Sequence, residues 1–335
     1  MSKAPIALSL GEPAGIGPEI IVKAWRALRE QGPAFVVVGD GEALIAAAGG
    51  DLAIARVDTA ADATAMFLTA LPILDRPLRS RPIPGQPSRD AAALVIDWIE
   101  LATRLALTGE ASAMVTAPIA KAPLYQAGFK FPGHTEFLGE LAPPASDATG
   151  RGPIMMLAAG DLRVSLVTIH VPLARVPGLI SVERIINAGR VTADALHRDF
   201  GIAKPRLAVT GLNPHAGESG ALGSEETAII APAVSALRTL GIEATGPHPS
   251  DSLFHAEART RYDAALCMYH DQALIPVKML DFWGGVNITL GLPIVRTSPD
   301  HGVGFDIAGQ GIARADSLIA ALRLAGSIAR QRART

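Results

Sequence analysis

The sequence of 335 residues contains one cysteine, Cys267, and few aromatic residues. A single thiol cannot form a disulfide within the chain, which is typical of a reducing compartment, so we expect a cytoplasmic location. Because Cys267 lies in the apolar run AALCM, we expect a buried small hydrophobic residue rather than a nucleophile. Aromatic residues make up only 4% of the chain, and Ala, Leu, Ile and Val carry most of its apolar content. Those residues suit strands that are buried on both faces and the helices that cover them.

Long hydrophobic runs and an excess of one charge are also missing. No stretch approaches the roughly 18 apolar residues that a membrane helix needs, and the N-terminal segment is too short for a signal peptide. The 30 basic and 32 acidic residues are interspersed and give a net charge of −2. Without a basic stripe or interleaved aromatic and arginine residues, nucleic acid is not an expected partner. The sequence therefore indicates a globular protein that binds neither a membrane nor nucleic acid.

Short apolar runs alternate with helical patterns along the whole chain, which indicates an α/β architecture with a largely parallel sheet. The expected strands are 6–10, 35–38, 113–116, 164–169, 206–210, 264–268 and 285–289. The expected helices are 18–29, 89–107, 182–200, 225–240 and 316–330, and Ser88, Ser181 and Ser224 precede three of them as N-caps. The length of the chain predicts two domains.

Three histidines follow separate expected strands. His170 ends VSLVTIH, His270 ends AALCMYH, and His215 follows RLAVTGLNP. The carboxyl ends of strands are where ligands bind in open α/β sheets, and three histidines from separate elements can form an open metal site. Each could equally hydrogen-bond locally, and no close metal spacing such as HExxH is present. A shared metal site and three local roles both remain open.

Two further groups of residues suit an anionic ligand. GHTEF at 133–137 offers a backbone amide, a hydroxyl and an imidazole, although a helix capped by Thr135 explains this segment equally well. Lys278, Asn287 and Arg296 lie in otherwise apolar sequence, where cations need partners. Acidic side chains or the phosphate of a ligand would satisfy them. Both interpretations stay open.

Two glycine-rich segments differ from the common nucleotide-binding motifs. GEPAGIG at 11–17 lacks the GxGxxG spacing, and no Walker lysine follows it, so a Rossmann assignment is excluded. DHGVGFDIAGQGIA at 300–313 precedes the last expected helix. Its glycines would let the backbone approach a flat ligand closely.

These segments together resemble the 4-hydroxythreonine-4-phosphate dehydrogenase family of pyridoxal-phosphate biosynthesis. The matching motifs are GEPAGIGPE at 11–19, TAPIAK at 116–121, PGHTEF at 132–137, TIHVPL at 168–173, GLNPHAGE at 211–218, YHDQ at 269–272, GVNITLGLP at 285–293, RTSPDHG at 296–302 and FDIAGQGIA at 305–313. The last two are also similar to the adenosine-binding loop of isocitrate and isopropylmalate dehydrogenases. The resemblance implies a non-Rossmann α/β protein of that type, with two α/β/α domains.

The resemblance also implies how the chain is organised. A discontinuous cofactor-side domain would comprise 1–132 plus about 290–335, and a metal-binding and dimerisation domain would comprise 133–289. The active site would lie in the cleft between them and be completed by the second subunit of a homodimer. One divalent ion (Zn, Mg, Co or Mn) would be held by His170, His215 and His270, with one ligand from across the dimer interface.

The remaining implied roles concern substrate and cofactor. Substrate contacts correspond to His134, Thr135, Lys278, Asn287 and Arg296. Contacts to NAD or NADP correspond to Gly291, His301, Gly302, Asp306 and Ile312. Asp251 and His134 are the candidate proton acceptors.

The implied reaction is the oxidation of 4-phosphooxy-L-threonine at C3 to 2-amino-3-oxo-4-phosphooxybutanoate, which decarboxylates to 3-amino-2-oxopropyl phosphate. A dehydrogenase of D-threonate or D-erythronate 4-phosphate would share the metal and phosphate sites, so it remains an alternative. A phosphate acyltransferase of related fold is a more remote one, because it needs neither the three histidines nor the nicotinamide segment. The expected site is complete, which argues against a non-catalytic binding protein.

Overall fold

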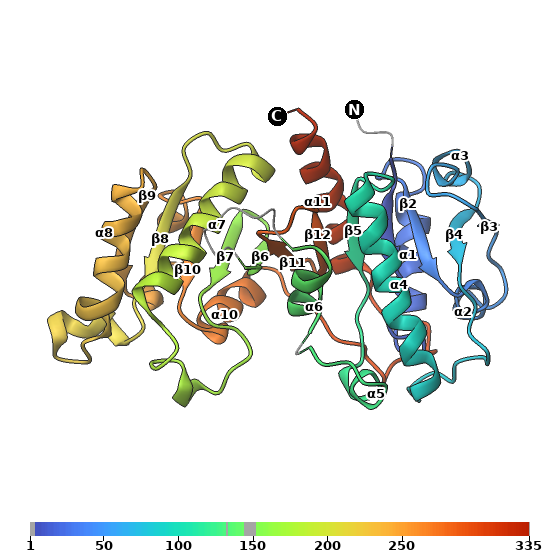
Figure 1. Ribbon diagram of the computed structural model, residues 1–335, viewed down its shortest axis with the longest axis horizontal. Coiled ribbons are helices and arrows are strands. Elements are labelled where there is room, and N and C mark those ends of the chain that lie inside the picture. Colours follow the sequence, from blue (N-terminus) through green and yellow to red (C-terminus); the bar gives the residue numbers. More distant parts are fainter. Residues whose placement is uncertain (1–3, 132, 144–151, 335) are drawn as a thin grey trace. The chain divides into compact units, whose positions relative to one another are not determined.

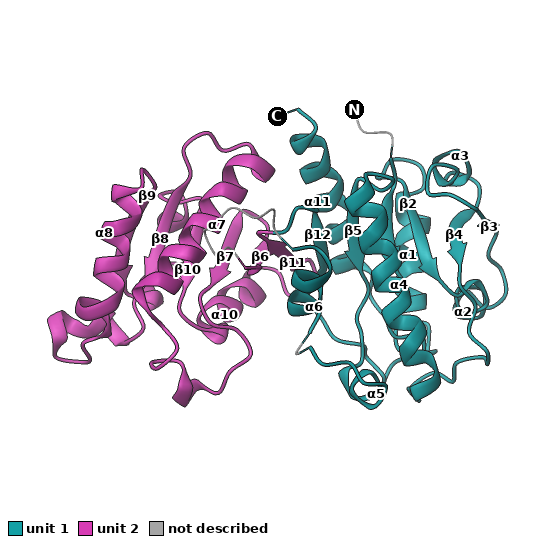
Figure 2. Ribbon diagram, in the orientation of Figure 1, with its two compact units in different colours: residues 1–145, 292–334 teal, residues 146–291, 335 magenta. Residues whose placement is uncertain are grey.

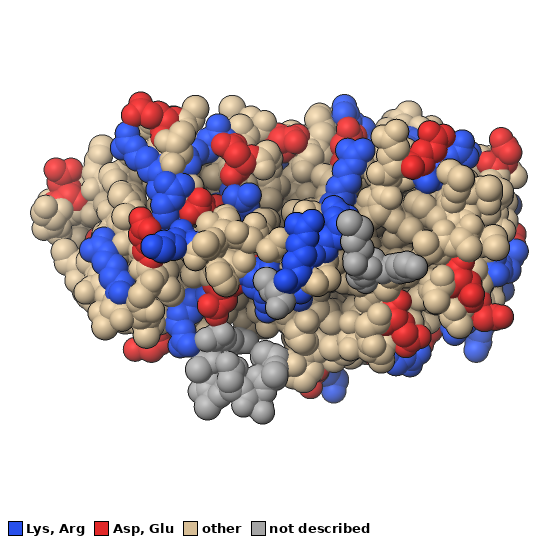
Figure 3. Space-filling model, turned by 90° about the horizontal axis from the view of Figure 1, so that it is seen from above, with Lys and Arg blue, Asp and Glu red and all other residues tan. Residues whose placement is uncertain are grey.

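The computed structural model describes residues 4–131, 133–143 and 152–334. Its backbone divides into two compact units (Figure 2). Unit 1 comprises residues 1–145 and 292–334, and unit 2 comprises residues 146–291. Acidic and basic side chains both occur on the surface of each unit in the face drawn in Figure 3. No helix in the described part of the chain is long and apolar enough to cross a membrane.

The strands of unit 1 are adjacent in the order β3-β4-β2-β1-β5-β12, and every pair is parallel. They are β1 (Ile6–Ser9), β2 (Phe35–Gly39), β3 (Ile54–Arg56), β4 (Leu71–Asp75), β5 (Ala113–Thr116) and β12 (Arg296–Pro299). Every residue of β1, β2, β5 and β12 is buried. Burial on both faces is what a parallel sheet covered by helices requires.

Helices of unit 1 cover this run of strands (Figure 1). They are α1 (Gly17–Leu28), α2 (Gly41–Ala47), α3 (Ala63–Met66), α4 (Arg89–Thr108), α5 (Lys121–Gln126), α6 (His134–Leu141) and α11 (Asp316–Arg332). Helix α4 packs on β1, β2 and β5, whereas α11 packs on β12 and β5 and also contacts α1. The predicted ends of α4 are confirmed, because Ser88 Oγ accepts from Ala91 N–H at 3.2 Å and Gly109 is left-handed with a φ of 79°.

The strands of unit 2 are adjacent in the order β11-β6-β7-β10-β8-β9. They are β6 (Ile154–Ala159), β7 (Leu162–Leu166), β8 (Arg206–Thr210), β9 (Glu243–His248), β10 (Ala264–Cys267) and β11 (Val286–Leu290). The pairs of β6 with β7 and with β11 are antiparallel, and the others are parallel. The predicted α/β architecture with largely parallel strands is therefore confirmed.

Helical segments of unit 2 include several short or irregular ones. They are η1 (Leu173–Arg175), α7 (Val182–Phe200), η2 (Pro214–Gly220), η3 (Glu226–Ile230), α8 (Ala231–Thr239), η4 (Ser250–Ser252), α9 (Ala256–Arg259) and α10 (His270–Leu280). The Ser181 cap of α7 is confirmed by its bond from Arg184 N–H at 3.2 Å. The Ser224 cap was wrong, because the helix begins at Glu226 with a π-helical turn and no side-chain cap. Cys267 is buried as predicted, and burial raises the pKa of its thiol.

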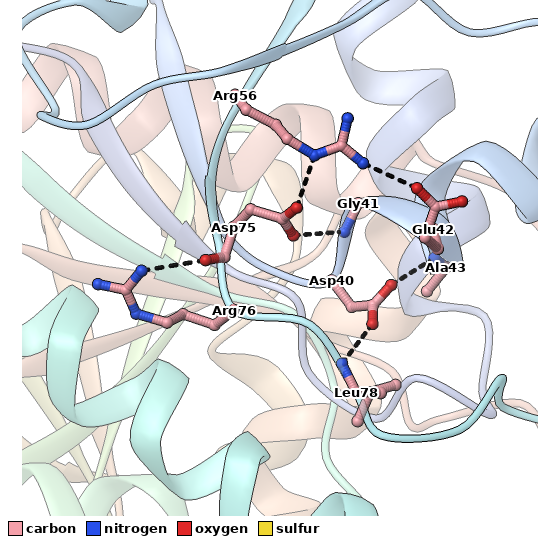
Figure 4. A network of polar contacts seen from close by, with 8 residues as sticks. All are labelled: Asp40, Gly41, Glu42, Ala43, Arg56, Asp75, Arg76 and Leu78. Atoms are coloured by element: carbon pink, nitrogen blue, oxygen red, sulfur yellow. Dashed lines mark hydrogen bonds and ion pairs between the residues drawn. The ribbon is translucent and has the colours of Figure 1, made fainter.

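A polar network fastens the proline-rich segment of unit 1 that begins at Leu78 (Figure 4). Asp40 follows β2, and its carboxylate accepts from Ala43 N–H at 2.7 Å and from Leu78 N–H at 2.5 Å. Asp75, at the end of β4, accepts from Gly41 N–H at 3.0 Å and from Arg56 Nε at 2.7 Å. These two carboxylates thus hold the chain in place beside an open cavity of about 680 Å³.

Candidate active site

A buried arginine in unit 1 is positioned by the pairing of two distant strands. Arg296 begins β12, which lies beside β5 with Arg296 opposite Met114. This register places the Arg296 guanidinium next to Thr116, and Nη2 donates to Thr116 Oγ1 at 2.6 Å. Arg296 is only 2% exposed, and burial lowers the pKa of its guanidinium to about 10. It therefore remains a cation at neutral pH, as the predicted anion site requires.

His134 lies in the electrostatic field of this arginine. It is the first residue of α6, and Gly133 is the N-cap without a side-chain bond, so the predicted cap by Thr135 was wrong. Desolvation lowers the pKa of His134 well below its usual range, and the charges of Arg296 and Lys121 lower it further. The imidazole is therefore neutral at pH 7. Its Nε2 atom is buried and has no hydrogen-bond partner among the described residues, which is the state of a group available to a ligand.

Two cationic side chains lie near His134 in unit 1. A forked guanidinium and an ammonium suit a phosphate or carboxylate, and Arg296 and Lys121 supply them. Thr135, in the first turn of α6, is half-buried. Sequence reasoning singled out neither Lys121 nor Thr116, although both lie in the motif TAPIAK at 116–121.

The three histidines of unit 2 follow the ends of adjacent strands, as predicted. Strand β10 lies between β7 and β8 and is parallel to both, so the carboxyl ends of all three lie at one edge. His170 and His270 are close, with ring centroids 5.6 Å apart. His270 Nδ1 is 2.8 Å from Asp271 Oδ1. Such a bond fixes the ring and leaves Nε2 as the nitrogen for a metal.

His215 lies apart from this pair, in an unusual left-handed turn. Its φ is 52°, and positive φ values continue through Ser219. Glu226 holds the start of the turn by accepting from Leu212 N–H at 2.8 Å and Asn213 N–H at 2.7 Å. Within the described residues of the chain, no three His, Cys, Asp or Glu side chains are placed to hold one metal ion. A single chain thus brings together two of the three expected ligands.

The other predicted residues of unit 2 occupy different elements. Lys278 lies on α10, with Nζ 5.2 Å from the centroid of the Phe282 ring. Asn287 lies on β11, and in the part of the chain that the structure describes its buried Oδ1 has no hydrogen-bond partner. Asp251 is exposed in the short turn η4. A buried amide oxygen without a partner is, like His134 Nε2, suited to a ligand.

The glycine-rich segments of unit 1 lie against each other. Gly11 has a φ of 72°, and a Cβ there would meet Pro118 O at 2.4 Å, while a Cβ on Gly15 would meet Val303 O at 2.7 Å. Gly15 thus permits the close backbone packing that places 11–17 beside 300–313, whereas Gly11 packs against residues 117–118. In the second segment, Ile312 is 61% exposed, and His301, Gly302 and Asp306 are also exposed. Gly291, at the end of unit 2, has a φ of 81°.

A cavity of about 250 Å³ lies beside the first glycine-rich segment and is lined by residues 12–14, 78–83, 86–88, 90 and 91. The Glu12 side chain on its wall is 3% exposed, and its Oε1 accepts from Ala14 N–H at 3.0 Å. Burial raises the pKa of Glu12, and the bond from Ala14 only partly opposes this. Sequence reasoning did not single out Glu12, although it lies in the motif GEPAGIGPE.

Comparison with known proteins identifies the family. A family model described as pyridoxal phosphate biosynthetic protein PdxA matches residues 31–325. The chain belongs to this family. Proteins named 4-hydroxythreonine-4-phosphate dehydrogenase from Caulobacter vibrioides and Maricaulis maris are 65% and 56% identical to it, over 99% and 98% of both chains respectively. The family resemblance drawn from the sequence is confirmed.

Solved structures agree with this assignment. A 4-hydroxythreonine-4-phosphate dehydrogenase from Klebsiella pneumoniae is 40% identical with a TM-score of 0.85, covering 97% of this PdxA-family chain and 99% of its own. A terephthalate 1,2-cis-dihydrodiol dehydrogenase from Burkholderia xenovorans is 28% identical with a TM-score of 0.63, covering 97% and 98%. A Staphylococcus aureus phosphotransacetylase, EutD, has a TM-score of 0.54 at 12% identity, covering 96% and 94%. That last similarity concerns the fold alone.

Proposed function

We propose that this PdxA-family protein is a metal- and NAD(P)-dependent 4-hydroxythreonine-4-phosphate dehydrogenase. It oxidises 4-phosphooxy-L-threonine at C3 to 2-amino-3-oxo-4-phosphooxybutanoate, which decarboxylates to 3-amino-2-oxopropyl phosphate in pyridoxal 5′-phosphate biosynthesis. The observation that carries this proposal is the 65% identity, over 99% of both chains, to a protein of that name. The buried cation and neutral imidazole of unit 1 suit the phosphorylated, anionic substrate.

The family resemblance implies substrate contacts within each of the two units. In unit 1, Arg296 and Lys121 provide positive charge beside His134, and Thr135 adds a hydroxyl. In unit 2, Lys278 provides an ammonium and Asn287 a buried amide oxygen. An ammonium and a guanidinium together suit the phosphate, because the ammonium is a compact point charge and the guanidinium presents paired N–H donors that can bind two oxygens. The buried polar atoms of His134 and Asn287 gain partners when the substrate binds, which favours a ligand with hydroxyl and amino groups.

The histidines of unit 2 fit a divalent cation. His170 and His270 have ring centroids 5.6 Å apart, and Asp271 orients the His270 ring. Within the described residues no third side chain joins this pair to hold one ion, and we propose that a histidine from a second copy of the chain completes the site. A bound divalent cation would stabilise the oxyanion that develops at C3 of the substrate. Histidine nitrogen favours Zn or Co, whereas the oxygen-rich substrate could recruit Mg or Mn.

An exposed apolar surface on α10 supports the homodimer. Ile275, Met279 and Leu280 on α10 and Phe282 and Trp283 just after it are exposed, and Met279 is 81% exposed. Large exposed apolar patches mark interfaces in soluble proteins. Helix α10 begins at the proposed ligand His270, so a second copy that covers this surface would pack against the helix that carries this ligand.

The two candidate proton acceptors are His134 and Asp251. The lowered pKa keeps the His134 imidazole neutral near pH 7, but the burial and nearby cations that lower it also make the imidazole a weaker base. Asp251 is exposed on η4 and remains the alternative. A nicotinamide dinucleotide, NAD or NADP, would accept the hydride from C3. The exposed segment with His301, Gly302, Asp306 and Ile312, together with Gly291, would hold it.

The test is dinucleotide reduction by the purified protein, first stripped of metal and then supplied with Zn, Co, Mg or Mn. We expect turnover with 4-phosphooxy-L-threonine and one of these metals, and much slower turnover with D-threonate or D-erythronate 4-phosphate. The reverse preference would support the alternative function, a dehydrogenase of D-threonate or D-erythronate 4-phosphate. His270→Gln should lose bound metal and activity, whereas His255→Gln, which changes an exposed histidine of the same unit, should retain both. Metal-independent turnover would refute the metal role.

A further inference from the structure

The end of the exposed segment 300–313 is tied to helix α1 by Lys23. The Lys23 ammonium donates to Gly311 O at 2.9 Å, Ala313 O at 2.6 Å and Glu19 Oε1 at 2.7 Å. The same Glu19 oxygen accepts from Ala313 N–H at 2.8 Å. Two residues one turn apart on α1 therefore bind the backbone of a segment almost 300 residues later in the chain.

This contact differs from an ordinary surface ion pair. An ammonium has three donors, and Lys23 directs them at one carboxylate and two main-chain carbonyls. The Glu19 side chain is only 7% exposed, and its second oxygen, Oε2, is buried with no hydrogen-bond partner within residues 4–131, 133–143 and 152–334. Exposed i,i+4 pairs contribute little because water screens them. A buried carboxylate that loses its cation is left uncompensated, so removing Lys23 disturbs the segment more than the loss of a surface pair would.

The remainder of the segment is held at its other end and is partly exposed in the middle. Val303 O accepts from Ile16 N–H at 2.9 Å, and Ser317 Oγ accepts from Asp300 N–H at 3.0 Å. Between these contacts and Lys23, Asp306 is exposed and Ala308 is buried, and Ile312, between the two residues that Lys23 binds, is exposed. The two main-chain bonds between Gly304 and Gln310 stay within the segment. The contacts of Lys23 therefore contribute to the order of this stretch in the protein without a ligand.

We propose that Lys23 is a positioning residue for the nicotinamide dinucleotide: by fixing Gly311 and Ala313 it orders the segment that carries Asp306 and Ile312. This inference rests on the proposed function, in which that segment holds the dinucleotide. A binding segment that is already ordered costs less free energy to bind than a mobile one. The three donors of Lys23 are directed at Glu19, Gly311 and Ala313, so we expect its effect in dinucleotide affinity rather than in the chemical step.

The test exploits the single cysteine of the chain. In Lys23→Cys, alkylation with 2-bromoethylamine restores an ammonium at nearly the lysine position, while Cys267 is buried and its pKa is raised, so it does not react. We expect the KM for the dinucleotide to rise on the order of tenfold in Lys23→Cys. The KM for the phosphorylated substrate and kcat should stay within about twofold, because the reacting groups are untouched. Alkylation should restore the dinucleotide KM.

A second readout needs no turnover. Amide hydrogen exchange in 304–313, measured without any ligand, should be faster in Lys23→Cys and return to the wild-type rate after alkylation. Lys23→Met keeps the apolar stem of the side chain and serves if the cysteine variant folds poorly. It should show the same raised dinucleotide KM and the same faster amide exchange. Arg261→Cys is the matched control, since Arg261 pairs with Glu257 at the same 2.7 Å and i,i+4 spacing but both side chains are exposed. It should change neither exchange nor KM.

Two outcomes separate this inference from the proposed function. If the wild-type protein turns over but both Lys23 variants keep the wild-type dinucleotide KM and exchange rates, the positioning role is overturned and the function stands. If the wild-type protein reduces no dinucleotide with any phosphorylated hydroxy acid, both the proposed function and the positioning role of Lys23 are overturned. A KM increase that alkylation fails to reverse would also count against the ammonium of Lys23.

Discussion

Replacing Thr116 by valine tests whether the buried Arg296 depends on its hydroxyl partner. The two residues are 0% and 2% exposed, and Arg296 Nη2 donates to Thr116 Oγ1 at 2.6 Å. Valine keeps the shape of threonine but cannot accept this bond. A buried charged donor that loses its acceptor costs about 1.5–3 kcal/mol. We therefore expect the free energy of unfolding of Thr116→Val to fall by that amount.

The assay is urea unfolding of the metal-free protein at pH 7.5, with Thr103→Val as the control. Thr103 is also buried in unit 1, but its hydroxyl donates to the main-chain Ile99 O at 2.7 Å, within α4. No charge is left without a partner there, so we expect a loss of no more than about 1 kcal/mol. An equal loss in the two variants would refute the reasoning, as would a loss below about 0.5 kcal/mol in Thr116→Val.

The same substitution has a predicted effect on activity. A guanidinium that is no longer held by Thr116 samples orientations that do not bind the substrate anion. We expect the KM for 4-phosphooxy-L-threonine to rise about fivefold, which corresponds to roughly 1 kcal/mol. The dinucleotide KM should not change. A wild-type substrate KM in Thr116→Val would show that Arg296 is positioned without this hydroxyl.

Two further predictions concern His134 and α10. Because the folded-state pKa of His134 lies below its ordinary value of 6.5, stability is retained above pH 6.5 and lost as pH falls towards the folded pKa. In metal-free protein the wild type should lose up to about 1.4 kcal/mol per pH unit more than His134→Gln in that window; parallel stability curves would contradict the lowered pKa. Met279→Glu should convert a dimer into monomers in sedimentation, whereas Leu240→Glu, at an exposed apolar site on α8's C-terminal end, should not. A dimeric Met279→Glu would exclude the α10 surface as the interface.

The architecture and much of the site were predictable because local patterns determine them. The ends of α4 and α7 follow from Ser88, Gly109 and Ser181, whose capping chemistry is local. The histidines after β7, β8 and β10 could be placed at one edge because parallel strands share the direction of their carboxyl ends.

Other elements escaped prediction because their sequences are not apolar or because tertiary contacts form them. Strand β12 reads RTSP and is fully buried despite three polar residues, and β9 reads EATGPH with a glycine and a proline. The strands β3, β4 and β6 were also missed, although β4 reads LPILD and β6 reads IMMLAA, which are largely apolar. The contact between Arg296 and Thr116 depends on the register of β12 against β5, and that of Lys23 with Ala313 depends on the packing of α1. Neither register nor packing can be read from residues that lie so far apart in the chain.

The central claim is that the chain couples oxidation of a phosphorylated hydroxy amino acid to the loss of its carboxylate. Its most direct test uses 4-phosphooxy-L-threonine labelled at the carboxyl carbon, with metal and with NAD or NADP. We predict that labelled carbon dioxide and reduced dinucleotide appear in equal amounts, and that both are lost together in Arg296→Met. Reduced dinucleotide without labelled carbon dioxide, or no reduction with this substrate under any of the metals, would contradict the account.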